Sequence, residues 1–286
     1  MILVADSGSS KTDWILQLPD AQGLEFSTKG INPFFLGEKE ITKIIHNSKE
    51  ISKYALDVKE VHFFGSGCTS PDRRETVSNA LSGIFKNAFI DVENDILGRA
   101  YATCGKQKGL VCILGTGSHL AFYDGEKVHQ SKQGLGYILG DEGSGTYFGK
   151  KLITSFLYDT MPKELKKEFD EFYKIDKETI IKNVYQKPSP NIYLSGFARF
   201  LSKNKNHPYV QDLLYNGFEE FIATNSAIFS EYKNFPCHFV GSIAFYFQAV
   251  LTEVCKKHRI SVGKVLTHPI KELYNFISEQ ELNRIS

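Results

Sequence analysis

A turn of small and hydroxyl-bearing residues near the start of the chain could bind phosphate. It follows the apolar run 2–5 and consists of Asp6, Ser7, Gly8, Ser9, Ser10, Lys11 and Thr12. Such a turn points backbone N–H groups and hydroxyls outward, where phosphate oxygens can accept their hydrogen bonds. An aspartate at the end of a strand can also hold Mg²⁺ through water. An ordinary polar hairpin with an Asx turn explains the segment equally well, and it contains no Walker A motif.

A similar turn recurs in the second half of the chain, where an apolar run is followed by Gly115, Thr116, Gly117 and Ser118. Small residues let a backbone come close to a phosphate group. One such turn is a weak signal, but two in equivalent positions favour a clamp on the phosphates of a nucleotide. The later pair Gly241 and Ser242 suits an adenine or ribose lying against backbone, although by itself it is a common strand-to-helix connection.

Carboxylates in two further segments could bind or activate a hydroxyl group. Asp95 could face a cleft and accept the proton of an attacking hydroxyl. Asn94 or Asp95 could equally cap the helix that follows, and the spacing alone favours the cap. The glycine-rich run 134–145 holds the adjacent carboxylates Asp141 and Glu142, which could accept hydrogen bonds from sugar hydroxyls or belong to a flexible loop.

The hydrophobic pattern predicts the elements that must position these residues. In the first part we expect strands at 2–5, 12–18, 24–28, 61–64 and 89–92, and helices at 38–55, 73–87 and 96–103. The pattern restarts near Gly109 with strands at 110–114, 119–123 and 127–130, a helix after the glycine-rich run, a helical insertion at 161–235, strands at 238–240 and 264–267, and helices at 242–257 and from Pro269. This weak internal duplication predicts two α/β lobes with mixed sheets and a cleft between them.

Composition narrows the function further. The net charge of +1 and the 23% of charged residues indicate neither a nucleic-acid nor a membrane partner. Five scattered cysteines without a C-x-x-C pair indicate reduced thiols rather than a disulfide framework or a zinc site. No leader segment or spanning apolar run is evident, so we expect a cytoplasmic protein.

Taken together, these residues resemble the N-acetylglucosamine kinases, which share a family with the ATPase activators of benzoyl-CoA reductase and hydroxyacyl-CoA dehydratases. The resemblance extends from Asp6 to the segment 268–273, and its most specific part is the G-x-G-x-x-x-G-D-E-G-S stretch that begins at Gly134. It implies two ribonuclease-H-like lobes of the actin/hexokinase type with an ATP cleft between them. The lobes would span 1–107 and 108–268, and the helix 269–286 would pack back on the first lobe.

The resemblance also implies roles for individual residues. Asp95 would be the catalytic base, and Asp6 would hold Mg²⁺ through water. ATP would be contacted by Asp6, Gly8, Ser9, Ser10, Lys11, Thr12, Gly115, Thr116, Gly117, Ser118, Gly241 and Ser242. The sugar would be contacted by Asn32, Pro33, Asp95, Gly134, Leu135, Gly136 and Asp141. The expected reaction is phosphorylation of the 6-hydroxyl of N-acetylglucosamine or a close amino sugar, and a homodimer is compatible with it.

Two departures from the family bear on the sugar. Some relatives have tryptophan where this chain has Leu135, and some have a hydrogen-bonding side chain where it has Pro33. Kinases of N-acetylmuramic acid or glucosamine are therefore alternatives. An activator ATPase would need cysteines near the cleft to hold an iron–sulfur cluster across a dimer. A non-catalytic sensor is disfavoured by the presence of both Asp6 and Asp95.

Overall fold

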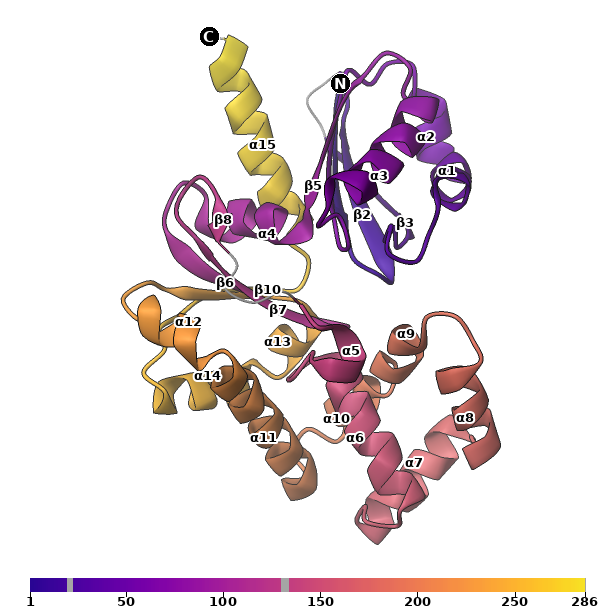
Figure 1. Ribbon diagram of the computed structural model, residues 1–286, viewed down its shortest axis with the longest axis vertical. Helices are drawn as coiled ribbons and strands as arrows, with labels where there is room; N and C mark the ends of the chain where they lie inside the picture. Colours follow the sequence, from indigo (N-terminus) through magenta and orange to yellow (C-terminus); the bar gives the residue numbers. More distant parts are fainter. Residues whose placement is uncertain (20–22, 130–133, 286) are drawn as a thin grey trace. The chain divides into compact units, whose positions relative to one another are not determined.

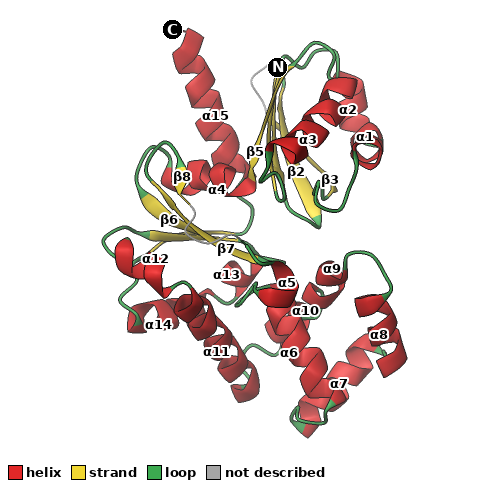
Figure 2. Cartoon of the chain, in the orientation of Figure 1, coloured by secondary structure: helices red, strands yellow, loops and turns green. Residues whose placement is uncertain are grey.

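The computed structural model describes residues 1–19, 23–129 and 134–285. The chain divides into two compact units. Unit 1 comprises Met1–Lys108, Tyr123–Val128 and His268–Ser286, and unit 2 comprises Gly109–Phe122 and His129–Thr267. Each contains a five-stranded sheet with helices (Figures 1 and 2). The predicted α/β fold with two mixed sheets is confirmed.

The sheet of unit 1 has the strand order β3-β2-β1-β4-β5. Its strands are β1 (Ile2–Ser7), β2 (Lys11–Gln17), β3 (Gly23–Lys29), β4 (Glu60–Gly65) and β5 (Phe89–Asn94). β1 is antiparallel to β2 but parallel to β4, which is parallel to β5. Ser7 pairs with Gly65 and Gly65 with Asn94, so the carboxyl ends of these three strands meet at one edge. Polar residues that follow them are thereby brought together.

Helices cover both faces of this sheet. One face, with Leu3, Ala5 and Phe63, packs against helices that include α1 (Glu38–His46), α2 (Lys49–Tyr54) and α3 (Pro71–Ile84). The other, with Val4 and Phe64, packs against α4 (Asp95–Cys104) and α15 (Ile270–Ile285). The alternation of these buried residues along β1 and β4 follows the two-residue period of a strand. The predicted helix 38–55 is two helices because Ser48 caps a new one, accepting a hydrogen bond from the Ile51 N–H at 3.3 Å.

The second sheet, which belongs to unit 2 apart from Tyr123 and Val128, has the order β10-β9-β6-β7-β8, the same connectivity as in unit 1. Its strands are β6 (Gly109–Leu114), β7 (Ser118–Tyr123), β8 (Val128–His129), β9 (Cys237–Val240) and β10 (Val262–Leu266). β6 corresponds to β1, β9 to β4 and β10 to β5. The internal duplication suggested by the two glycine turns is therefore present in the backbone. Gln130, the last residue of a predicted strand, lies outside the described residues.

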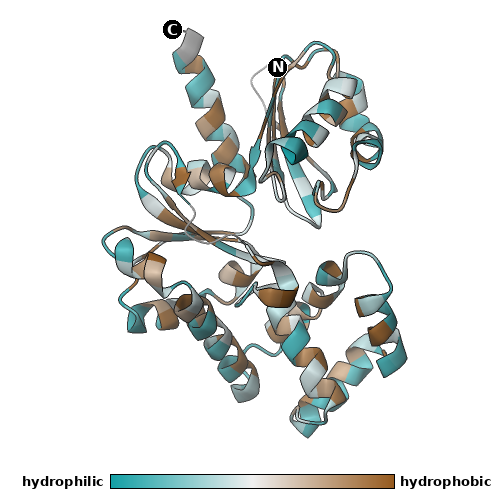
Figure 3. Ribbon diagram, viewed as in Figure 1, coloured by the Kyte–Doolittle hydropathy of each residue, from teal (hydrophilic) through white to brown (hydrophobic). Residues whose placement is uncertain are grey.

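Unit 2 also contains most of the helices. They are α5 (Gly136–Leu139), α6 (Gly145–Leu157), α7 (Lys163–Tyr173), α8 (Lys177–Tyr185), α9 (Pro190–Ser195), α10 (Ala198–Lys203), α11 (Pro208–Thr224), α12 (Ser226–Glu231), α13 (Ser242–Tyr246) and α14 (Gln248–Lys257). Hydrophobic residues recur among polar ones along these helices (Figure 3). Their buried faces form an aromatic core that includes Phe148, Phe169, Phe200 and Phe218. The predicted helical insertion between α6 and β9 is confirmed. Among the described residues, no helix combines the length and the apolar composition that a membrane span needs.

Gly241 connects β9 to α13 in a conformation that other residues rarely adopt. Its φ is +125°, and a Cβ placed on it would overlap the carbonyl oxygen of Leu114 at the end of β6. Its own N–H donates to the Leu266 carbonyl oxygen at 2.8 Å. Both the backbone conformation and the close approach of β6 therefore require glycine here.

We expect Gly241→Ala to lower the free energy of unfolding by about 2–4 kcal/mol, because it adds backbone strain and a steric overlap. Gly83→Ala is the matched control, since a Cβ there meets no atom within 4 Å and the residue lies in α3. The control should be neutral or stabilising. Denaturant unfolding of the two variants checks this, and equal stabilities would contradict the assignment.

Candidate functional site

The carboxyl edge of the unit 1 sheet gathers a buried group of charged side chains. Asp6 lies at the end of β1, and Asp95 begins α4 directly after β5. Each residue is only 7% exposed. The parallel pairing of β1, β4 and β5 is what brings together two aspartates that are far apart in sequence.

The helix cap beside Asp95 is Asn94. The Asn94 side chain accepts a hydrogen bond from the Ile96 N–H at 3.0 Å, so Asp95 is left as the first residue inside the helix. The Asp95 Oδ2 atom accepts a hydrogen bond from the Ser66 hydroxyl at 2.5 Å. Of the two readings that the sequence allowed for Asp95, the cap is excluded, and its carboxylate is available for another role.

Arg99 lies between the two aspartates. Its guanidinium forms ion pairs with Asp95 Oδ2 at 2.8 Å and with Asp6 Oδ1 at 3.4 Å. Arg99 is itself only 7% exposed. Sequence reasoning missed this residue, although its i,i+4 spacing from Asp95 on a predicted helix places both on the same face. The same reasoning missed Ser66, whose only signal was its place in the glycine turn after β4.

Two carboxyl groups and one guanidinium are thus buried together, and this environment shifts the pKa values of Asp6 and Arg99. Burial, assisted by the nearby Asp95 and Asp13 carboxylates, raises the pKa of Asp6 to about 6, although Arg99 opposes the shift. Burial would by itself lower the pKa of Arg99, but the two carboxylates outweigh it and raise that pKa. Arg99 therefore stays charged, and ionisation of Asp6 is the costly step.

The geometry at Asp6 fits a magnesium site of the kind expected from the sequence. In the described part of the chain, Asp6 Oδ1 is buried and accepts no hydrogen bond, and its only polar contact is the long ion pair to Arg99. Mg²⁺ keeps several of its waters in proteins and is held by few carboxylates. A water ligand of the ion would supply the hydrogen-bond donor that Oδ1 lacks.

The first glycine turn joins β1 to β2. The Gly8 N–H donates to the Lys11 carbonyl oxygen at 2.9 Å, and the Lys11 ammonium pairs with Asp13 at 2.6 Å. The Thr12 hydroxyl is buried and makes hydrogen bonds with the Ser7 hydroxyl at 2.7 Å and the Lys29 carbonyl oxygen at 3.2 Å. Thr12 therefore supports the hairpin from within the sheet, while Gly8, Ser9 and Ser10 form the turn itself.

Asn32 and Pro33 lie beside this turn. The Asn32 amide donates to the Ser9 hydroxyl at 3.0 Å, and its carbonyl oxygen accepts from the Phe34 N–H at 2.9 Å. Gly67 approaches the same amide so closely that a Cβ would overlap the Asn32 oxygen. The structure thus places a predicted sugar residue and a predicted phosphate residue in direct contact.

Unit 2 carries the second glycine turn, between β6 and β7. The Ser118 N–H donates to Asp141 Oδ1 at 3.1 Å, and the same carboxylate lies against Gly117. Asp141 has a left-handed backbone, with φ of +61°. Burial raises its pKa, although the Ser118 N–H lowers it in part. Asp141 therefore occupies one backbone donor of the turn that the sequence assigned to phosphate.

The other predicted residues of unit 2 fall into two places. Gly241 packs against the backbone of Leu114 and Gly115, and Ser242 begins α13, so these residues share one end of the adjacent parallel strands β6 and β9. Gly134, Leu135 and Gly136 lie at or just before the short helix α5, which is exposed. Gly115, Gly241 and Ser242, which the sequence assigned to ATP, are thus neighbours, as residues that bind one ligand must be.

All five cysteines are buried, and none of them forms a disulfide. A cluster held between two copies of the chain would need thiols at the surface. The structure therefore gives no support to the iron–sulfur alternative.

Comparison with known proteins identifies the family. No protein-family model and no curated protein sequence matches the chain. It is, however, 37% identical to a proposed N-acetylglucosamine kinase of known structure from Porphyromonas gingivalis, with a TM-score of 0.91 over 98% of this chain and 100% of that one. The chain belongs to the N-acetylglucosamine kinase family.

More distant structures share the fold alone. A proposed N-acetylglucosamine kinase from Chromobacterium violaceum is 16% identical with a TM-score of 0.70, over 96% of this chain and 98% of that one. A ROK-family glucokinase from Streptomyces griseus, solved with glucose and AMPPNP, is 13% identical with a TM-score of 0.57, over 95% and 97%. This chain therefore has the two-lobed fold of sugar kinases.

The pKa of Asp6 leads to a test of stability. Because folding raises this pKa from the ordinary 3.8 to about 6, the contribution of Asp6 to stability falls as the pH rises from about 4 to above 6. Asp6→Asn cannot ionise, so its stability relative to wild type should increase by about 1–3 kcal/mol over this interval and then level off. Denaturant unfolding at pH 4.5 and pH 8, without Mg²⁺ or nucleotide, checks this. A difference that is the same at both pH values would contradict the buried-charge account.

Proposed function

We propose that this kinase transfers the γ-phosphate of ATP to the 6-hydroxyl of N-acetylglucosamine or a close amino sugar. The observation that carries the proposal is the position of Asp95, a buried carboxylate that is neither a helix cap nor a surface group. It is supported by 37% identity over the whole length of a proposed N-acetylglucosamine kinase. The expected acceptors, N-acetylmuramic acid and glucosamine included, all present hydroxyl groups to such a base.

Asp95 acts in this proposal as the base that accepts the proton of the sugar hydroxyl. In the described part of the chain, both polar contacts of its carboxylate, from Ser66 and Arg99, fall on Oδ2. Oδ1 is thereby left to meet the substrate. Because phosphoryl transfer has a loose transition state, the main task of such a base is to orient the hydroxyl. The fixed contacts at Oδ2 serve that task.

The remaining residues bind and orient the two substrates. We assign the ATP phosphates to the turns Gly8–Ser10 and Gly115–Ser118, and the adenosine to Gly241 and Ser242. Asp6 would hold Mg²⁺ through water, and the ion would neutralise charge on the transferred phosphate. We assign the sugar to Asn32, Pro33, Gly134, Leu135, Gly136 and Asp141. The contact between Asn32 and Ser9 links the two substrate sites within unit 1.

We expect ADP release from Mg²⁺-ATP to depend on an added amino sugar, with N-acetylglucosamine the best acceptor among N-acetylmannosamine, N-acetylmuramic acid, glucosamine and glucose. A coupled assay of ADP release over these sugars measures this. Absence of sugar-dependent turnover with every acceptor would refute the kinase function. ADP release that is unaffected by sugars would instead favour an ATPase.

Asp95→Asn should lower kcat by about 10²- to 10⁴-fold, the usual contribution of a catalytic base, while ATP still binds. Asp72→Asn is the matched control, because Asp72 is exposed in the first turn of α3 and should leave kcat unchanged. Steady-state kinetics and ATP titration calorimetry on both variants check this. If Asp95→Asn retains wild-type turnover, the carboxylate only stabilises the structure.

A further inference from the structure

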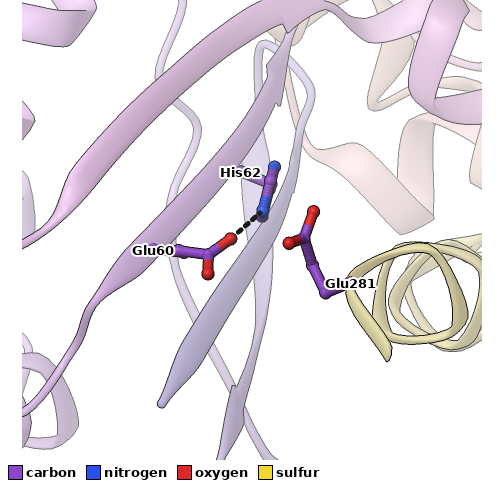
Figure 4. Close-up of side chains that lie close together, drawn as sticks. All are labelled: Glu60, His62 and Glu281. Atoms are coloured by element: carbon purple, nitrogen blue, oxygen red, sulfur yellow. Dashed lines mark hydrogen bonds and ion pairs between the residues drawn. The ribbon is translucent and has the colours of Figure 1, made fainter. Parts of the chain in front are cut away.

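A second polar cluster lies in unit 1, away from the strand ends that hold Asp95. Glu60 and His62 are alternate residues of β4, so their side chains point to the same face of the sheet. Glu281, on α15, points toward them from the helix that covers this face (Figure 4). His62 is 5% exposed and Glu281 8%, and α15 packs on the same face against apolar residues that include Val4, Ile15 and Phe64.

The imidazole of His62 is held by carboxylates at both ring nitrogens. Nδ1 lies 3.4 Å from Asp91 Oδ2 on β5, and Nε2 lies 3.3 Å from Glu60 Oε2. If Nδ1 carries the proton and donates it to Asp91, the lone pair of Nε2 is directed at Glu60 and Glu281. This is the carboxylate–histidine arrangement that orients a histidine ligand in protein metal sites.

The three side chains are close enough together to share one metal ion. One ligand atom from each of Glu60, His62 and Glu281 lies within 4.8 Å of the others. Two ligands bound to a tetrahedral ion at about 2.0–2.1 Å lie about 3.3–3.4 Å apart, whereas an ordinary hydrogen bond is about 2.7–3.2 Å long. The separation of 3.3 Å between Nε2 and Glu60 Oε2 equals this ligand spacing, and without a metal ion the same two atoms form a hydrogen bond.

Charge points the same way. In the described part of the chain, neither Glu60 nor Asp91 forms an ion pair with a lysine or arginine, and both face His62. Their side chains are 31% and 39% exposed and flank the buried imidazole, so they favour a positive charge beside His62. A divalent ion bound to Nε2 would supply that charge.

We propose that Glu60, His62 and Glu281 bind a divalent transition-metal ion, with Zn²⁺ the best fit and water as the fourth ligand. The nitrogen ligand favours Zn²⁺ over Mg²⁺, which takes oxygen ligands. The ion joins α15 to β4 and so fixes the C-terminal helix to the sheet. This site is separate from the magnesium site at Asp6, and it does not depend on the proposed reaction.

The test is metal binding by the full-length protein, stripped with chelator and titrated at pH 7.5 with Zn²⁺ or Mg²⁺. We expect one Zn²⁺ per chain, measured by competition with a chromophoric chelator, and a rise in melting temperature that Mg²⁺ does not produce. Glu281→Gln and His62→Gln should each weaken Zn²⁺ binding at least 10-fold. Asp91→Asn, which removes only the support of the imidazole, should weaken it about 10- to 100-fold.

Glu279→Gln is the matched control, since Glu279 is an exposed glutamate on the same helix and should bind Zn²⁺ as wild type does. Co²⁺ substitution distinguishes the ligands, because nitrogen and oxygen ligands give no thiolate charge-transfer band. Such a band, or equal Zn²⁺ affinity in wild type and Glu281→Gln, would overturn the proposal. So would wild-type protein whose stability responds to pH but not to Zn²⁺, because His62 would then hold a proton instead of a metal.

Discussion

The pairing of two buried aspartates with one buried arginine is the constraint on which the architecture of unit 1 depends. Charges taken out of water are costly unless each has a partner, and removing one member leaves another uncompensated. Asp6, Asp95 and Arg99 can meet only if β1 and β5 end at the same edge of the sheet, and the single guanidinium compensates the ionised Asp6 only in part. Their contact also requires α4 to begin at Asp95, which puts Arg99 one helical turn away on the same face.

The duplicated fold separates two kinds of chemistry. In unit 1 the strand ends carry buried charges, which suit proton transfer and magnesium. In unit 2 the equivalent strand ends carry glycines whose backbone approaches other backbone closely, as Gly241 does at β6. Asp141 already accepts a hydrogen bond from the second glycine turn, so a phosphate that binds there must displace that carboxylate or share its donor. The same sheet topology thus supports a site of buried charged side chains in unit 1 and a site of closely packed glycine backbone in unit 2.

The sequence predicted the strands, both glycine turns and the duplicated order of elements, because these depend on local periodicity and turn residues. It did not separate Asn94 from Asp95 as the helix cap, since a shift of one residue decides which side chain reaches the free N–H groups. Arg99 was missed for a different reason. An arginine four residues after an aspartate is usually a solvated pair, and Arg99 is buried only because α4 packs against the sheet and α15. Glu281 was missed likewise, because its partners on β4 are more than two hundred residues distant in the chain.

The central claim is that Asp95 directs a sugar's 6-hydroxyl at the γ-phosphate of ATP. Proton-coupled ³¹P NMR of the product from N-acetylglucosamine and Mg²⁺-ATP tests it most directly, because the splitting reports the carbon that bears the phosphate. The account predicts a phosphomonoester triplet, from coupling to the two protons at C6. A doublet from phosphate at C1, or an uncoupled signal of inorganic phosphate alone, would contradict it.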